Sequence, residues 1–352
     1  LKLERDPRGD IPLELFGGKQ YSRGAAILHN LRRHVGDEVF RDAIRLYVKR
    51  HADSTVTSED LRTVVEEVAG EDLGWFWNQW VYGLGYPKLD VRYDERAQQL
   101  IVRQVQKQAG GQGLFRIRVP IRWANQAAPV TYTIHKERHA FPMPRDGAFL
   151  RFGVGGDLLR QVPQHQRHGA WGEALLKDTD VTGRMDAAAA LEGFGPASDA
   201  PLRMALENDR SWAVRRTAAE VLGRMDAPHA ARALLVGVSD PDARVREAVM
   251  NGMARKKRQQ IGAAVGKAAA NDEHPSVRAA AARAVGKVKA QGAYEALVAM
   301  LAVDSDRDVV RTGAIDGLKS LGDARACEAV MPFLDYRWGK GANHVMRQAA
   351  LN

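Results

Sequence analysis

The chain has 352 residues, of which 45% are hydrophobic and 27% are charged, and its formal net charge is +9. This is the composition of an ordinary globular protein, long enough for two or three domains with cores of their own. It has no apolar run long enough to span a membrane, and its single cysteine, Cys327, excludes an intramolecular disulfide.

Residues 24–81 are predicted to form four consecutive helices, because hydrophobic residues recur there at helical spacing. Gly36 and Gly70 each follow such a stripe and are expected to end their helices. Thr57 is the expected N-cap of the third helix, with Asp60 three residues later as in a capping box. Aromatic residues of the last helix are expected to pack in a core, and not to form a base-stacking or cofactor site: Trp75, Phe76, Trp77 and Trp80.

After Pro87 the hydrophobic period changes from about 3.6 residues to 2 residues, which indicates strands. Short alternating segments separated by turns predict a small antiparallel β-sandwich. The segments are 89–93, a stretch near Leu100, 115–123, 130–134 and a stretch near Phe149.

From about residue 165 the chain is predicted to be helical and repetitive. An arginine recurs at spacings of 31, 31, 32 and 33 residues: Arg184, Arg215, Arg246, Arg278 and Arg311. An aspartate shortly before each arginine is expected to cap the helix that follows: Asp180, Asp209, Asp242, Asp272 and Asp308. A fixed period of this length predicts an α-solenoid of HEAT-like repeats. Ala248 and Gly252 depart from the pattern, which leaves the register of the third repeat open.

Both ends are expected to be truncations. A further repeat begins at Val345-Met346-Arg347, and the sequence stops at Asn352, inside what would be its first helix. Leu1 is not an initiator methionine, and no apolar segment of a signal peptide follows it. No compartment is predicted.

Four short motifs occur in order in the first part of the chain. They are Tyr21-Ser22-Arg23-Gly24, Gly70-Glu71-Asp72-Leu73, the Trp-rich helix and Gly85-Tyr86-Pro87. Together they resemble the segment just downstream of the zinc site in the membrane alanyl aminopeptidase family, the gluzincin zinc metallopeptidases that include the leukotriene hydrolases. Arg23 stands where the family usually has lysine, which keeps the charge but changes the hydrogen-bond geometry.

The resemblance covers residues 12 to about 160 and implies a multidomain α+β fold. Residues 1–86 would be the C-terminal helical part of the catalytic domain, residues 87–162 a small antiparallel β-sandwich, and residues 163–352 the HEAT-like solenoid, truncated at its end. In this family the tyrosine that corresponds to Tyr21 stabilises the transition state. Outside the family, a tyrosine here would be expected half-buried just before a helix, with its hydroxyl bonded to a backbone carbonyl.

The resemblance implies a zinc-dependent aminopeptidase that hydrolyses N-terminal residues from peptides. The family's zinc ligands lie upstream of Tyr21, so this chain alone is expected to hold no zinc and to be inactive. The first alternative is a non-catalytic relative that binds a protein partner on the concave face of its repeats. A second alternative, a free-standing repeat protein that binds acidic partners, fits the charge but leaves the first 160 residues unexplained.

Two other clusters are predicted to be structural. His135 and His139 have Glu137 between them, but a zinc motif of the type His-Glu-x-x-His needs a helix and a glutamate directly after the first histidine. On a strand they would lie about 13 Å apart, so no metal site is expected. The basic cluster 255–258 has no interleaved aromatic residues, so no nucleic-acid partner is expected.

Overall fold

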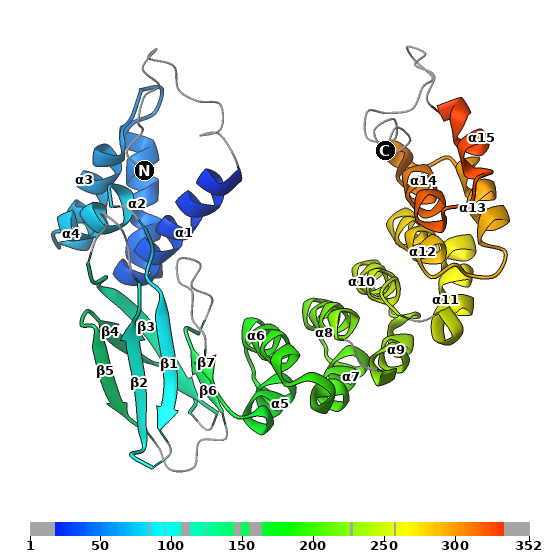
Figure 1. Ribbon diagram of the computed structural model, residues 1–352. Coiled ribbons are helices and arrows are strands. Elements are labelled where there is room, and N and C mark those ends of the chain that lie inside the picture. The colour runs from blue at the N-terminus through cyan, green and yellow to red at the C-terminus, as the bar shows by residue number, and fades with distance from the viewer. Residues whose placement is uncertain are drawn as a thin grey trace. The chain divides into compact units, whose positions relative to one another are not determined.

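The computed structural model describes residues 18–83, 85–94, 96–106, 113–124, 126–143, 149–154, 164–225, 228–256 and 258–333. The chain divides into two compact units, Leu1–Gln166 and Arg167–Asn352 (Figure 1). The first unit joins helices to a β-sandwich and the second is helical, which confirms the predicted multidomain α+β class. The repeat expected to begin at Val345 lies outside the described residues.

The four predicted helices of the first unit are present, with one change of type. They are α1 (Gly18–Val35), α2 (Asp37–Arg50), α3 (Ser58–Ala69) and a last helix that starts as α4 (Gly74–Phe76) and continues as a π-helical turn (Trp77–Val81). Gly36 and Gly70 have φ of 93° and 68° at the expected helix ends. The predicted capping box is confirmed, since the Thr57 N–H donates to Asp60 Oδ2 over 2.7 Å.

The aromatic residues of the last helix form the centre of the helical core. Phe76, Trp77 and Trp80 are buried, as predicted, and Trp77 Nε1 donates to the Ser58 carbonyl over 3.0 Å. Trp75 is only partly buried. The same cluster includes Phe115, which comes from the β-sandwich segment. Phe115 therefore attaches the sandwich segment to the helical core, and Ile117 packs against both this cluster and the core of the sandwich.

The β-sandwich has two small sheets, as the alternating segments predict. One sheet has the order β5-β2-β1-β7 and the other β4-β3-β6, and all pairs are antiparallel except β1–β7. Val91 pairs with Val102 across the first sheet, and Ile117 pairs with Ile134 across the second. Buried side chains of both sheets share one core. The strands are β1 (Leu89–Asp94), β2 (Gln99–Gln104), β3 (Ile117–Trp123), β4 (Val130–Ile134), β5 (Arg138–Pro142), β6 (Leu150–Phe152) and β7 (Gln164–His165).

The expected separation of His135 and His139 is wrong. The chain turns after Ile134 and begins β5 at Arg138, so the two residues flank a turn, and their ring centroids are 5.1 Å apart. His139 Nε2 accepts the backbone N–H groups of His135 and Lys136 over 3.1 Å and 3.0 Å. His139 therefore stabilises the turn by which the chain passes from β4 in one sheet to β5 in the other.

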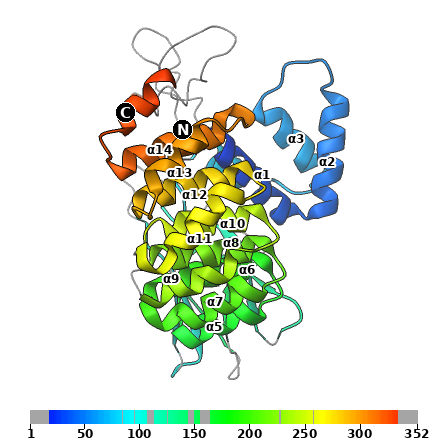
Figure 2. The ribbon, with the colours of Figure 1, turned by 90° about the vertical axis from the view of Figure 1, so that its right-hand side faces the viewer.

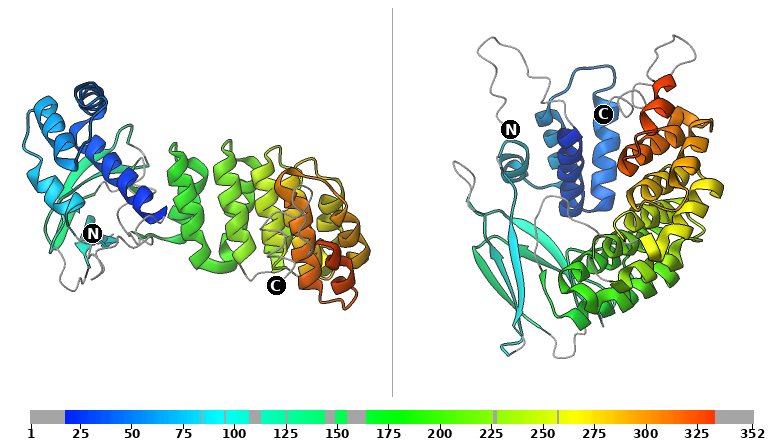
Figure 3. Two further views of the ribbon diagram at one scale, coloured as in Figure 1. Left: turned by 90° about the horizontal axis from the view of Figure 1, so that it is seen from above. Right: turned by 45° about the vertical axis from the view of Figure 1, so that its right-hand side comes forward.

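The second unit consists of helix pairs, which confirms the predicted α-solenoid. In Figures 2 and 3 the first helices of the pairs form one layer and the second helices form another. The first helices are α5 (His168–Lys177), α7 (Asp199–Asn208), α9 (Pro228–Leu234), α11 (Arg258–Asn271) and α13 (Ala293–Leu301). The second helices are α6 (Val181–Leu191), α8 (Trp212–Arg224), α10 (Ala243–Met253), α12 (Pro275–Lys287) and α14 (Val309–Leu321), and α15 (Ala326–Val330) follows.

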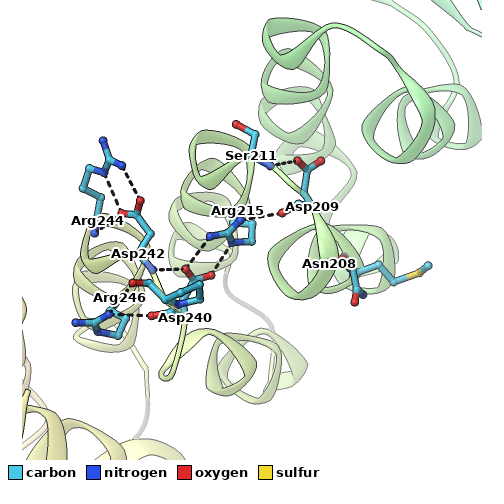
Figure 4. Close-up of polar contacts among 10 residues, drawn as sticks. Asn208, Asp209, Ser211, Arg215, Asp240, Asp242, Arg244 and Arg246 are labelled. Carbon is cyan, nitrogen blue, oxygen red and sulfur yellow. Dashed lines mark hydrogen bonds and ion pairs between the residues drawn. The ribbon is translucent and has the colours of Figure 1, made fainter.

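Three of the recurring arginines link each helix pair to the next one, in what we call the arginine–aspartate ladder. The rungs are Arg184 to Asp209, Arg215 to Asp240 and Arg246 to Asp272, with Nε–Oδ2 distances of 2.7, 2.6 and 2.9 Å. Figure 4 shows the rung from Arg215 to Asp240. Each Nη2 group donates to the other carboxylate oxygen over 2.9 to 3.0 Å. Each Nη1 group donates to a carbonyl six residues earlier, in the arginine's own pair, over 2.8 to 2.9 Å.

The ladder changes the role of several aspartates that were expected to be caps. Asp180 and Asp242 do cap α6 and α10. Asp209 and Asp272 accept the N–H of Ser211 and His274, but the N-caps of α8 and α12 are those two residues, and the aspartates serve the ladder. Asp308 is the N-cap residue of α14, but it has φ of 54°, and its side chain makes no capping hydrogen bond and pairs with Arg311 instead.

Arg246 settles the register of the third repeat, since it makes the same contacts as Arg184 and Arg215. Burial alone would raise the pKa of its partner Asp272, but hydrogen bonds from Arg246 and from the His274 N–H outweigh burial and hold that pKa below its usual value. After this rung the ladder stops. Arg278 and Arg311 donate to the carbonyls of Ala269 and Leu301.

Between α12 and α14, glycines allow a close backbone approach in place of a ladder rung. A Cβ atom added at Gly286 would lie 1.9 Å from the Gly317 carbonyl oxygen, and one added at Gly313 would lie 2.6 Å from the Ala279 Cα. Such distances are far below van der Waals contact, so only glycine fits at these points without moving a helix.

We expect Arg215→Met to lower the free energy of unfolding of the second unit by about 3–5 kcal/mol, because it leaves the buried Asp240 carboxylate without its partner. The matched control is Arg216→Met on the next residue, whose pair with Glu220 is exposed; that change should cost at most about 0.5 kcal/mol. Urea unfolding followed by circular dichroism compares the two variants. Equal midpoints would contradict the role of the ladder.

We expect Gly286→Ala to lower the free energy of unfolding by about 1–3 kcal/mol or more, because α12 and α14 must separate to admit the methyl group. Gly266→Ala in α11 is the control, since nothing lies within 4 Å of its added Cβ. That change should raise stability by about 0.5–1 kcal/mol through helix propensity. Thermal unfolding of both variants checks the opposite signs, and destabilisation by both would rule out a specific contact at Gly286.

Candidate functional site

Tyr21 lies in the first turn of α1, three residues after the helix begins at Gly18. Its side chain is 75% exposed. Within the described ranges no hydrogen-bond partner contacts its hydroxyl. The tyrosine is therefore neither half-buried nor bonded to a backbone carbonyl, and its phenol is accessible to a ligand.

The helix that carries Tyr21 is firmly held. Arg23, two residues later, donates from Nη2 to the carbonyl of Gly83 over 3.0 Å. Ala26 and Leu31 are buried on the inner face of the same helix. The contact of Arg23 joins the first motif to the segment just before the last motif, Gly85-Tyr86-Pro87, although Arg23 and Gly83 are 60 residues apart in the chain.

The second motif begins the last helix of the helical part. Leu73 is fully buried, and its N–H donates to Glu66 Oε1 over 2.7 Å. Asp72 Oδ1 accepts the N–H of Gly74 over 2.6 Å at the start of α4. Glu71 Oε1 lies 3.2 Å from His34 Nε2 near the end of α1. The two ends of α1 thus contact the segments that follow and precede the last helix.

The described residues do not form a metal centre. Among them, no group of three or more histidine, cysteine, aspartate or glutamate side chains is placed to hold a metal ion. The residues present therefore do not fit a zinc site, and no chemical step is assigned to zinc in this part of the chain. None of the helices in the described ranges is both long and apolar enough to cross a membrane.

Sequence reasoning missed one cluster of polar side chains. His34, Arg116 and Arg118 come together at the junction of α1 and β3. The two arginines alternate along an extended segment and therefore project from the same face of it. That alternation was the available signal, but the histidine that faces them lies more than 80 residues earlier in the sequence.

Comparison with known proteins identifies both parts of the chain. The model of the peptidase family M1 domain matches residues 6–80, which include Tyr21 and the Trp-rich helix. This part of the chain is similar to the peptidase family M1 domain. The model of HEAT repeats matches residues 170–254, 232–319 and 262–351, which together make up more than half of the chain, so this chain belongs to the HEAT-repeat family. Both results confirm the resemblance seen in the sequence.

Similar proteins include several aminopeptidases. Aminopeptidase M1-C from Oryza sativa subsp. japonica is 35% identical over 79 residues, which is 22% of this chain and 9% of that protein. Leucyl aminopeptidase from Saccharolobus solfataricus is 26% identical over 141 residues, which is 40% of this chain and 18% of that protein. The chain therefore spans less than a fifth of the length of either relative.

The fold has a solved counterpart in a crystal structure of aminopeptidase A from Legionella pneumophila. The TM-score is 0.63 at 15% sequence identity, and the match covers 99% of this chain and 45% of that chain. At this level of identity the likeness concerns the fold. It supports the order of helical part, sandwich and solenoid.

Proposed function

We propose that this chain is part of a zinc-dependent aminopeptidase that hydrolyses N-terminal residues from peptides, and that Tyr21 is a catalytic residue. The observation that supports this most is the exposed phenol of Tyr21 on a helix that the M1 family model covers. The names of the relatives support the reaction class.

The chemical role of Tyr21 follows from its hydroxyl group. A phenol donates one hydrogen bond, and a donor fixed near a scissile carbonyl stabilises the negative charge that forms on its oxygen in the transition state. Arg23 and the buried face of α1 hold the backbone that carries the phenol, so little backbone reorganisation accompanies the reaction. Zinc, when bound, supplies an activated water. We place its ligands upstream of this chain, as the resemblance implies.

We expect Tyr21→Phe to lower kcat about 10²–10³-fold in the protein that carries this chain together with its zinc ligands, because one oxyanion donor is lost. Zinc content and KM should change little. Tyr82→Phe is the control, since Tyr82 is half-exposed and its hydroxyl bonds to Glu59; its kcat should stay within about twofold of the wild type. Hydrolysis of an amino-acid anilide measures all three proteins, and full activity in Tyr21→Phe would show that the assignment is wrong.

The 352-residue chain alone is expected to bind no stoichiometric zinc and to cleave no amino-acid anilide. Metal analysis by mass spectrometry after dialysis, together with the anilide assay, measures both. One tightly bound zinc per chain would contradict this prediction. Absence of zinc and of activity from the protein with its upstream residues would instead favour the non-catalytic scaffold.

A further inference from the structure

A small pocket lies where the helical part of the first unit meets the β-sandwich. Its lining residues come from the end of α1, from the last helix and from the start of β3. Its volume is ≈ 40 Å³, and one water needs about 10–15 Å³ on the same measure. The pocket therefore accommodates a group of three or four heavy atoms. The residues that matter for its chemistry are Arg33, His34, Trp75, Trp80, Arg116 and Arg118.

The apolar wall of the pocket is rigid. Trp80 is buried in the helical core, and the Trp75 ring meets the His34 ring edge-on at a centroid distance of 5.2 Å. The backbone of Arg116 is fixed by the Gln79 side-chain amide, which accepts its N–H over 2.7 Å and donates to its carbonyl over 2.9 Å. Little side-chain ordering is then needed when a ligand binds.

The pocket carries an excess of positive charge. The guanidinium of Arg116 lies over the Trp75 ring, 4.5 Å from its centroid, and Arg118 Nη1 donates to the His34 carbonyl over 2.9 Å. Within the part of the chain that the structure describes, neither these two arginines nor Arg33 pairs with a carboxylate. An unpaired guanidinium beside a cavity is a site for a carboxylate or phosphate ligand.

The electrostatics of His34 and Glu71 limit the charge of that ligand. Burial lowers the pKa of His34, and the Glu71 carboxylate raises it by a smaller amount, so the imidazole is neutral at pH 7. Glu71 adds a negative charge 3.2 Å from the ring. A monoanion is therefore favoured over a dianion such as phosphate.

We propose that this pocket binds the carboxylate of a small apolar acid, with Arg116 and Arg118 holding the carboxylate and the Trp75 ring contacting the apolar part. A planar carboxylate matches the donor geometry of guanidinium and the size of the pocket. Thirteen residues separate His34 from Tyr21 along α1, so the pocket lies roughly 20 Å from the tyrosine. The inference does not depend on the proposed role of Tyr21.

Ligand-observed NMR on the 352-residue chain tests the proposal with phenylacetate as the probe. We expect saturable binding with Kd on the order of 1 mM. Phenylacetamide has the same shape without the charge and should not saturate. Inorganic phosphate should not displace phenylacetate at equal concentration. Equal binding of the amide, tighter binding of phosphate, or no saturable binding of phenylacetate would each overturn the proposal.

Variants place the binding in this pocket. Arg116→Gln and Arg118→Gln should each weaken phenylacetate binding about tenfold or more, because each removes a charge-assisted hydrogen bond. Arg103→Gln is the control for net charge, since this exposed arginine lies on β2 in the other sheet; binding should change by less than about twofold.

Glu71→Gln should change the affinity for phenylacetate in the opposite direction to the two arginine variants. It removes a negative charge near the pocket while keeping the shape of the side chain, so phenylacetate should bind a few times more tightly. Circular dichroism confirms that each variant is folded. Unchanged binding in both arginine variants, or weaker binding in Glu71→Gln, would show that phenylacetate binds elsewhere.

Discussion

Within each of the two units, guanidinium groups that donate to backbone carbonyls stabilise the packing of the chain. Arg23 reaches Gly83, and Arg118 reaches the carbonyl of His34, each across more than 50 residues. In the second unit each ladder arginine donates to a carbonyl of its own helix pair and also pairs with a carboxylate of the next helix pair. A carbonyl at a helix end lacks an intrahelical donor, and an arginine supplies one without leaving its own charge unsolvated.

Most of the fold could be predicted because it depends on local patterns. The Thr57–Asp60 box, the alternating strands and the spacing of the arginines are all visible in the sequence. The turn between β4 and β5 was not predicted, since the residues from His135 to Arg138 include no glycine, proline, asparagine or aspartate. The ladder role of Asp209 and Asp272 could not be predicted, because each pairs with an arginine that lies 25 or 26 residues earlier in the sequence.

One part of the candidate site could be predicted from the sequence and another part could not. Tyr21 could be singled out because it belongs to a short motif, and the structure adds its exposure and the anchoring of its helix. The pocket at the junction could not be predicted, because its lining residues come from α1, the last helix and the start of β3, which are far apart in the sequence. Such a site has no contiguous signature, and only the packing of the helical part on the sandwich creates it.

The ladder also bears on how this solenoid could change in length over generations. The pairs α7–α8 and α9–α10 each carry one arginine that bonds to the next pair and one aspartate that accepts from the pair before. A duplicated pair inserted there would import a matching donor and acceptor, so the array could grow with every ionic contact intact. Beyond Arg278 the packing of one helix pair on the next depends on particular glycines. A helix pair inserted between α12 and α14 would have to match the surfaces of both neighbouring helices.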